Sequence, residues 1–451
     1  MRRDHVVSVG VAALAASAGL AVAGGPTLSN TLGAPGMSGS YIAAFHAHDD
    51  GSGEKLYATG SFTVAGVPGT TNLARWNGSS WESVGGGLVN QYSNTMTSFQ
   101  GDLIVGGYFD SANGVAGTAK LARWDGTQWH SMDAQSEIFL NSVWDLAVWD
   151  DGTTGEQLYV AGNYSDIGGV GGPDHIAKWD GTTYTPVGGT IGGAVPLIVL
   201  DLLVADLGDG EKLYAGGRFL TIDGVPANNI AVWDGTSWSA LGDGVTPSAG
   251  FAQVLHMTAW DDGNGMALYV GGRFANAGGS PASRVAKWDG TSWSAMGAGL
   301  DADCQELVVF DDGSGEALYA LGEFAHPDAG TFVLAKRWNG ETWDDYLTSN
   351  DGAFGGIVYD AGEGNAMHIG GSFSSVEGVS SNRVISVLGT SGGCNAADLA
   401  EPFGVLDFSD VVAFLGAFDG MQSEADLAEP FGTFDFSDVV AFLGAFAGGC
   451  P

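Results

Sequence analysis

Short apolar segments, separated by turns rich in glycine and aspartate, run through most of this chain. The segment LYATGSF at residues 56–62 returns six more times in recognisable form. The seven copies end on an aromatic residue at steps of 47 to 55 residues: Phe62, Phe109, Tyr164, Phe219, Phe274, Phe324 and Phe373. Self-similarity at such a period is typical of a protein built from one small repeated unit.

A second pattern follows six of the seven copies, in which two aromatic residues flank Asn-Gly or Asp-Gly, as in RWNGSSW and KWDGTSW. These dipeptides favour a two-residue hairpin turn, because both central residues of this turn need positive φ, which Asn, Asp and Gly adopt more readily than other residues. With Asn77-Gly78 as this turn, Trp76 and Trp81 would be diagonal neighbours on one face of the hairpin. We expect the tryptophans of all these pairs to pack between stacked sheets: Trp76, Trp81, Trp124, Trp129, Trp179, Trp233, Trp238, Trp288, Trp293, Trp338 and Trp343.

Each repeat holds four such segments, which in the first are YIAAFHAH, KLYATGSF, NLARW and SWESVG. Seven repeats of four strands predict a mainly β protein, a seven-bladed β-propeller of four-stranded antiparallel blades spanning residues 24–390. The seventh repeat lacks its fourth strand, and residues 29–33 offer one. We therefore expect this N-terminal strand to close the ring, since closure removes open sheet edges.

The N-terminal segment predicts a secretory signal peptide. MRRDH is basic, residues 6–22 are apolar, and Ala21-Val22-Ala23 is a small-residue cleavage site, so the signal would be residues 1–23. An uncleaved membrane anchor is the alternative. Elsewhere no apolar run is long enough to span a bilayer, so we expect no membrane insertion after cleavage and a secreted or surface-associated protein.

Charge excludes some partners. The 451 residues include 52 Asp+Glu against 15 Lys+Arg, for a formal net charge of −37. A strongly negative surface repels nucleic acid and anionic lipid. Many carboxylates fall in turns such as DDGSGE between the first two strands of a repeat, where they either bind a hard cation such as calcium or only shape the turn.

Candidate catalytic chemistry is sparse. His46 and His48 share one face of a strand, where they either begin a metal site or are polar residues without that role. No nucleophile elbow, HExxH or Walker loop occurs, and we predict no catalytic residue. Cys304, in DADCQEL, is interpreted as a buried strand residue.

The last part of the chain, residues 391–451, predicts a separate small helical domain. Residues 397–420 and 425–448 are nearly identical copies. In the first copy Val411, Phe414 and Leu415 begin an apolar stripe of helical spacing, so two loop-helix units would pack against each other.

Both parts resemble known families. The GGxF and WDGTSW pair resembles the repeats of kelch-like and Rax2-like extracellular β-propellers, a resemblance that implies fold and not activity. The duplicated segment resembles the cysteine-flanked (GC-type) dockerin-like modules of planctomycete-type bacteria. That resemblance implies calcium as a cofactor, a protein receptor as partner and these ligands: Asp398, Glu401, Asp407, Asp410, Asp426, Glu429, Asp435 and Asp438. Ala400 and Pro402-Phe403 occupy the middle ligand positions, so an apolar plug without an ion is the alternative.

Cys394 and Cys450 bracket this duplicated segment, and in a secreted protein we expect them to form a disulfide. Taken together, the sequence favours a non-catalytic surface or binding protein, with a glycan as candidate ligand of the repeats and the C-terminal segment as anchor. The alternatives are an extracellular polysaccharide-active hydrolase or lyase on the same scaffold, and a structural or adhesive surface component.

Overall fold

The computed structural model describes residues 20–21, 26–33, 36–132, 140–152, 155–164, 175–193, 196–362 and 364–389, with four single positions between 411 and 439. Within these ranges the regular structure is almost entirely β-strand, apart from the 3-10 turn η1 (Thr31–Gly33). The strands form ten separate antiparallel sheets.

Five of the ten sheets have four strands each, paired in the order of the chain. They are formed by β3 (Met37–Asp49), β4 (Glu54–Val64), β5 (Leu73–Trp76) and β6 (Trp81–Ser83); β8 (Ser93–Phe99), β9 (Asp102–Gly107), β11 (Leu121–Trp124) and β12 (Trp129–Ser131); β13 (Leu140–Trp149), β14 (Gln157–Tyr164), β15 (Ile176–Trp179) and β16 (Tyr184–Pro186); β18 (Ile198–Asp206), β19 (Glu211–Arg218), β22 (Ile230–Trp233) and β23 (Trp238–Ala240); and β25 (Gln253–Asp261), β26 (Met266–Arg273), β29 (Val285–Trp288) and β30 (Trp293–Ala295).

The other sheets differ in size. The six-stranded sheet joins β31 (Cys304–Asp311), β32 (Glu316–Ala325), β33 (Phe332–Trp338), β34 (Trp343–Ser349), β37 (Ser375–Val376) and β38 (Val379–Ser380), and the five-stranded sheet joins β35 (Ala353–Asp360), β36 (Asn365–Gly371), β39 (Val384–Leu388), β2 (Thr27–Ser29) and β1 (Leu20–Ala21). Three small sheets pair β7 (Leu88–Val89) with β10 (Ser111–Ala112), β17 (Ile191–Gly192) with β20 (Thr221–Ile222) and β21 (Val225–Pro226), and β24 (Val245–Thr246) with β27 (Asn276–Ala277) and β28 (Ser280–Pro281).

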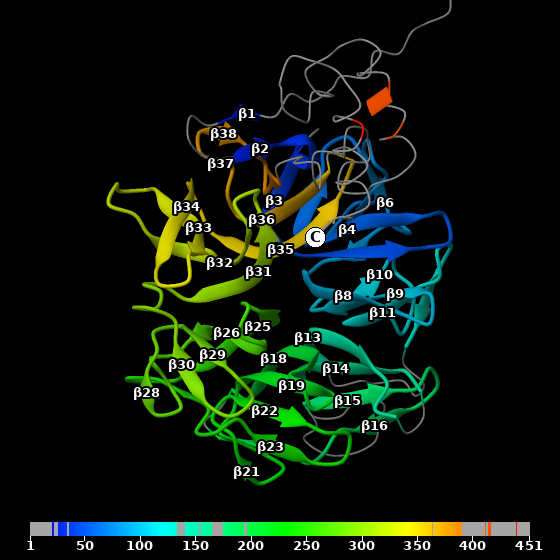
Figure 1. Ribbon diagram of the computed structural model, residues 1–451. Coiled ribbons are helices and arrows are strands. Elements are labelled where there is room, and N and C mark those ends of the chain that lie inside the picture. The colour runs from blue at the N-terminus through cyan, green and yellow to red at the C-terminus, as the bar shows by residue number, and fades with distance from the viewer. Residues whose placement is uncertain are drawn as a thin grey trace, which may run out of the picture.

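The first strands of the seven larger sheets lie around a common centre (Figure 1). Contacts run from β3 to β8, β13, β18, β25, β31 and β35 in turn, and β35 contacts β3 again. The N-terminal strand β2 pairs with β39, which places residues 27–29 beside residues 386–388. The expected pairing of an N-terminal strand with the last repeat is therefore confirmed, although the strand is Thr27–Ser29 and residues 31–33 form a 3-10 turn.

The expected fold as a whole, a seven-bladed propeller of uniform four-stranded blades followed by a helical domain, is wrong. The described strands fall into ten sheets of two to six strands, and the part of the chain that the structure describes contains no helical domain. The extra strands come from short segments such as TIDGVPA, which lies between Phe219 and the paired tryptophans of its repeat. In this segment β20 and β21 form a hairpin of their own and pair with β17 instead of extending a larger sheet.

The turn between paired aromatic residues also differs from our expectation. Trp76 lies directly opposite Trp81 and is not its diagonal neighbour. The loop has four residues, because Asn77 N–H donates to the carbonyl of Ser80. The Asn77 side chain accepts from the backbone N–H of Ser80, and Gly78 has positive φ while Asn77 does not. An Asx-type turn thus replaces the two-residue hairpin.

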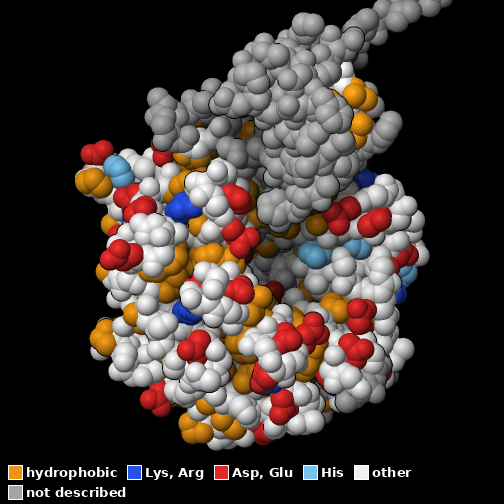
Figure 2. Space-filling view, viewed as in Figure 1, with side chains coloured by type: hydrophobic (Ala, Val, Ile, Leu, Met, Phe, Trp, Pro, Cys, Tyr) orange, Lys and Arg blue, Asp and Glu red, His pale blue; other side chains and the backbone are white. Residues whose placement is uncertain are grey.

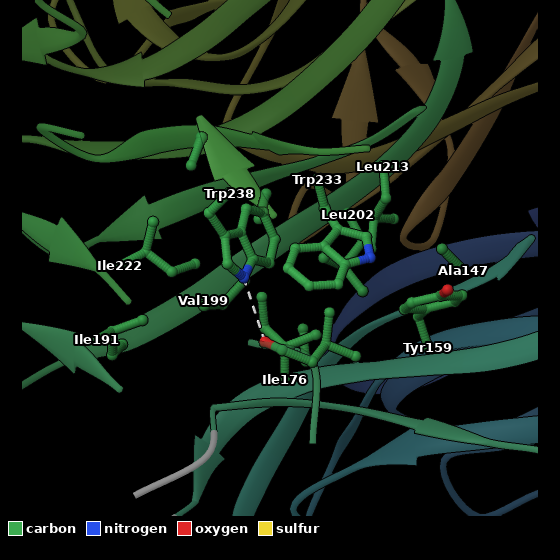
Figure 3. Packing of buried hydrophobic residues seen from close by; sticks show 14 of the residues in the cluster. Ala147, Tyr159, Ile176, Ile191, Val199, Leu202, Leu213, Ile222, Trp233 and Trp238 are labelled. Carbon is green, nitrogen blue, oxygen red and sulfur yellow. Dashed lines mark hydrogen bonds between the residues drawn. The ribbon is translucent and has the colours of Figure 1, made fainter. Parts of the chain in front are cut away.

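The paired aromatic residues contribute to the contacts between neighbouring sheets. Trp238 is buried in a cluster that joins strands of the β13–β16 and β18–β23 sheets (Figure 3). Its indole Nε1–H donates to the carbonyl of Val187 over 3.2 Å, drawn as the dashed line. Trp81 makes the equivalent bond to Leu32 over 2.7 Å, so these indoles link successive sheets by packing and by a hydrogen bond.

Candidate functional site

Every one of the seven first strands has a β-bulge at the same place in its repeat. In β13 the pairing shifts between Val143 and Asp145, which leaves Trp144 without a cross-strand partner. A bulge bends its strand and redirects the side chains beside it. We call the unpaired residues the bulge residues: Ala43, Asn94, Trp144, Leu200, Leu255, Gln305 and Phe354. The next residues along the chain are the post-bulge residues: Ala44, Thr95, Asp145, Asp201, His256, Glu306 and Gly355.

All seven bulge residues and six of the post-bulge residues line one cavity of about 590 Å³, which we call the axial cavity. The molecule is hollowed near the centre of the ring, with hydrophobic side chains at the wall of the hollow (Figure 2). Gly355 is the post-bulge residue that does not line the cavity. Because the repeats place chemically different residues at equivalent positions, the wall is asymmetric, with charged groups on one side.

The polar post-bulge side chains link neighbouring first strands. Asp145 accepts from the backbone N–H of Leu202 over 2.8 Å and from the Thr95 hydroxyl over 2.9 Å. The Asp201 carboxyl accepts from the backbone N–H of Met257. These bonds join four successive sheets, so the charged wall also has a structural role.

Asp201 differs from Asp145 in that one of its oxygens is unsatisfied. Its Oδ2 atom is buried and has no hydrogen-bond partner in the structure, and the residue is 7% exposed. Burial raises the pKa of Asp145 to about 6. Burial also raises the pKa of Asp201 well above its ordinary value, and the nearby Asp145 and Glu306 raise it further. A buried acceptor without a donor is unfavourable, which makes this atom the strongest candidate for contact with a ligand.

His256 and Glu306 complete the charged wall. His256 Nε2 lies 3.1 Å from Glu306 Oε1, and the backbone N–H of Leu307 donates to His256 Nδ1 over 3.2 Å. Burial lowers the pKa of His256, but Glu306 and Asp201 together raise it to about 9. The imidazolium therefore balances one of the three carboxyl groups of the cavity.

Aromatic rings form the opposite side of the axial cavity. Tyr41 contacts Phe354 edge to face with 5.3 Å between ring centroids, and Tyr92 with 6.2 Å. Tyr92 in turn stacks on Tyr108 at 5.8 Å. Tyr41, Tyr92 and Phe354 line the cavity near the beginning of their strands, whereas the acidic turns follow the ends of these strands. The aromatic group and the acidic turns are thus at opposite ends of the first strands.

A second pocket, of about 470 Å³, lies between the β25–β30 sheet and the six-stranded sheet. Several of its polar groups already have partners, although the Tyr269 hydroxyl does not. Trp260 Nε1 donates to Glu316 over 2.6 Å, and Lys287 Nζ lies 2.5 Å from Asp262. Because these groups already bond to one another, this pocket has fewer polar groups available to a ligand than the axial cavity has.

The acidic turns use their carboxylates within the fold. Asp49 Oδ1 accepts from the N–H groups of Gly51 and Gly53, and the same pattern recurs at Asp206, Asp261, Asp311 and Asp360. The second aspartate of such a turn forms an ion pair with a basic side chain on the third strand of its sheet. In one turn Asp151 Oδ2 lies 2.6 Å from Lys178 Nζ. The geometry therefore supports the turn-shaping interpretation over a ring of cation sites. No cluster of three or more metal-ligating side chains occurs among the described residues.

The side chains of His46 and His48 both contact the hydroxyl group of Ser98. His46 Nε2 and His48 Nδ1 each lie 2.8 Å from Ser98 Oγ on the adjacent sheet. Burial, and secondly His48, lowers the pKa of His46 to about 4, which keeps this imidazole neutral. The pair thus joins two sheets through Ser98, in agreement with a role that needs no metal.

Cys304 begins β31 and is fully buried, as expected, and burial raises the pKa of its thiol. The expected calcium ligands and the predicted Cys394–Cys450 disulfide lie outside the described residues. Most of the predicted signal peptide does too, although Leu20–Ala21 pairs with β2. Among the residues that the structure describes, no helix is long and apolar enough to cross a membrane.

Sequence reasoning missed the charged wall, although the repeats contain a signal for it. When the first strands are aligned, VWDL, VLDL, VLHM and CQEL carry an ionisable residue at the same place before an apolar one, and in the first three an apolar residue also precedes it. A charge in the middle of an apolar strand is unfavourable unless it is paired, so its recurrence in successive repeats marks a shared environment.

No family model matches the chain, and no curated protein matches it. The kelch-like and dockerin-like resemblances therefore find no support in these comparisons. Among solved structures, the extracellular domain of a putative hybrid two-component system from B. thetaiotaomicron is similar with a TM-score of 0.47 and 11% identity over 80% of this chain. The extracellular domain of a putative one-component system from the same organism has a TM-score of 0.43 and 10% identity over 77% of this chain. This chain spans about 40% of the first of these structures and 39% of the second, and similarity at this level identifies neither family nor function.

Proposed function

We propose that this chain is a non-catalytic carbohydrate-binding protein whose ligand enters the axial cavity. The observation that carries the proposal is the wall of this cavity, which combines the rings of Tyr41, Tyr92, Trp144 and Phe354 with a small set of polar groups. A sugar ring presents C–H groups that pack on aromatic rings and hydroxyls that exchange hydrogen bonds. An apolar cavity with few convergent polar groups is the usual form of a small-ligand site.

Two unpartnered polar atoms strengthen the proposal. Trp144 Nε1 is a buried donor and Asp201 Oδ2 a buried acceptor, and both residues line the cavity. A hydroxyl group can accept from the first and donate to the second. A bound sugar would therefore satisfy two groups that the protein leaves without partners.

Most carboxylates of the cavity are engaged within the protein, which favours binding over catalysis. Asp145 accepts from Leu202 and Thr95, and Glu306 faces His256. The second candidate function is glycoside hydrolysis, because Asp201, whose pKa is raised, lies in the same cavity as other carboxyl groups. Glycoside hydrolysis uses two carboxyl groups in one cleft, and a raised pKa suits the one that acts as general acid.

The predicted signal peptide supports a place outside the cytoplasm. The duplicated segment at residues 397–420 and 425–448 is our candidate for attachment to a protein receptor. Nothing in this assignment depends on the axial cavity. The two roles can therefore be tested separately.

The test uses the full chain on a glycan array, followed by titration calorimetry of each bound glycan. Phe354→Ala removes a ring of the cavity wall, and Phe251→Ala is the matched control, since both phenylalanines are 37% exposed and Phe251 does not line the cavity. We expect Phe354→Ala to weaken binding at least tenfold and Phe251→Ala to leave it unchanged.

Two results would overturn the proposal: no glycan bound by the full chain, or equal losses in the two variants. Release of reducing sugar from a bound polysaccharide would establish the hydrolase instead. In that case Asp201→Asn should abolish the release.

A further inference from the structure

The charged wall of the axial cavity has more negative than positive groups. Three carboxyl groups, of Asp145, Asp201 and Glu306, line the cavity, and His256 is the basic side chain among its lining residues. The His256–Glu306 pair is self-contained at 3.1 Å. Among the described residues no ion pair joins His256 to Asp145 or Asp201, although its positive charge acts to lower the pKa of both carboxyls.

Asp201 is the carboxyl group whose hydrogen bonding and protonation a bound ligand would change most. Its Oδ2 has no hydrogen-bond partner although the residue is more than nine-tenths buried. Asp145 and His256 lie on the strands on either side of β18, and Glu306 lies on the strand beyond β25. The two carboxyls add to the effect of burial in favouring the protonated form of Asp201, and His256 opposes them. A cation placed beside Oδ2 would reverse that balance, because an opposite charge stabilises the carboxylate.

The aromatic side of the cavity favours the same kind of ligand. The faces of aromatic rings attract cations, and this attraction grows where water is excluded. Tyr41, Tyr92 and Phe354 bring such rings to the side of the cavity opposite the carboxyls, and Trp144 lies next to Asp145 on β13. A neutral hydroxyl would satisfy Oδ2 but would not stabilise the ionised form of Asp201 as a cation does.

On the basis of the proposed function, we propose that the carbohydrate carries a free amino group, which enters the axial cavity as an ammonium and donates to Asp201 Oδ2. The ligand class is thus an amino sugar or the amino-sugar end of a chain. When Asp201 holds a proton in the empty cavity, that proton leaves to solvent as the ammonium binds. The ligand keeps its three N–H groups, and the only bond that breaks is the Asp201 O–H bond, whose proton passes to water or buffer.

The test compares three β-1,4-linked tetrasaccharides that differ at carbon 2 of each ring: the tetramers of glucosamine, of N-acetylglucosamine and of glucose. Binding to the full chain is measured by titration calorimetry in physiological salt at a mildly acidic pH, where the amine is charged. We expect the glucosamine tetramer to bind at least tenfold more tightly than the other two.

Variants separate a specific site from general attraction to an acidic protein. Asp201→Asn keeps an acceptor for the Met257 N–H, so the fold should persist, which the thermal unfolding midpoint checks. Asp209→Asn is the matched control, because it removes one charge from the exposed turn after β18, where the Asp209 side chain is 67% exposed. We expect Asp201→Asn to remove the preference for glucosamine and Asp209→Asn to retain it.

The outcomes distinguish this inference from the proposed function. If all three tetramers bind equally and depend on Phe354, the amino-group inference is wrong and carbohydrate binding stands. Equal effects of Asp201→Asn and Asp209→Asn would likewise refute the inference, since the preference would then follow net charge. If no tetramer and no arrayed glycan binds, both proposals fail.

Discussion

His256 on β25 and Glu306 on β31 form an ion pair between neighbouring sheets, with 3.1 Å between Nε2 and Oε1. On the other side of the imidazole, the backbone N–H of Leu307 donates to Nδ1 of His256 over 3.2 Å. This contact requires Nδ1 to be unprotonated. The rise of the His256 pKa from 6.5 to about 9 corresponds to roughly 3 kcal/mol. This exceeds the roughly 1 kcal/mol of one neutral hydrogen bond. We therefore expect the imidazolium to dominate at neutral pH and the Leu307 bond to weaken.

This pair predicts a pH dependence of stability. Because the pKa of His256 is higher in the folded than in the unfolded chain, its stabilisation is complete below about pH 6.5 and is lost as the pH rises through about 9. Between these values the free energy of unfolding of the wild type should fall by roughly 2–3 kcal/mol, measured by chemical denaturation at each pH. In Glu306→Gln the decrease should be less than half as large.

Glu211→Gln is the control for this measurement, because it removes an exposed carboxylate at the start of β19. It should show the wild-type pH dependence. A Glu306→Gln variant with an undiminished slope would mean that the pair does not couple protonation to folding.

Gly355 is predicted to be essential to the junction between β35 and β3. A Cβ atom at this position would lie 2.3 Å from the carbonyl oxygen of Ala43. Because that oxygen belongs to the backbone, it cannot move aside without shifting β3. Gly355→Ala should therefore lower the free energy of unfolding by roughly 1–3 kcal/mol, as measured by chemical denaturation.

Gly352→Ala is a matched control three residues earlier. The nearest atom to its Cβ would be the Glu323 Cβ, at 3.3 Å, which is much farther than the 2.3 Å to the Ala43 oxygen at position 355. We expect little change in stability. Equal losses in the two variants would contradict the tight junction inferred at Gly355.

The pairing of β2 with β39 predicts that the N-terminal segment stabilises the whole ring. Leu28 is fully buried in the cluster that also contains Val387. Leu28→Ala should cost roughly 2–5 kcal/mol, and deletion of residues 26–36 should lower the thermal unfolding midpoint further. Thr27→Ala, on the same strand but only half-buried, should have a small effect. An unchanged midpoint after the deletion would show that closure contributes nothing to stability.

The sequence was most informative where a pattern recurs in register. The aromatic ends of the repeats and the need for an N-terminal partner strand followed from counting alone, since both reflect which backbone groups must be paired. The prediction for the turn after Trp76 was wrong because it considered only the backbone preference of the Asn-Gly dipeptide. The Asn77 side chain accepts from the Ser80 N–H, and this bond favours a loop of four residues. The small sheets were missed because strands as short as β20 have no hydrophobic period to detect.

The axial cavity could not have been predicted from any single repeat. Its wall depends on a bulge, and a bulge reverses the faces of the residues that follow it, so strict alternation places Trp144 and Asp145 incorrectly. The unsatisfied Oδ2 of Asp201 depends further on which neighbours the ring brings to it. Such a relation between distant repeats exists only in three dimensions.

Calcium binding by the C-terminal segment stays a prediction, and the turns described above make it testable in the full chain. Asp49 and its equivalents already accept from glycine N–H groups, so the acidic turns should add little calcium affinity. We expect calcium to release or absorb heat in titration calorimetry and to raise the thermal unfolding midpoint through the loops that contain Asp398 and Asp426. The double variant Asp398→Asn/Asp426→Asn should lose both effects, whereas Asp209→Asn should keep them. Absence of heat and of any midpoint shift in the wild type would instead support the apolar plug formed by Pro402 and Phe403, which fills the loop without an ion.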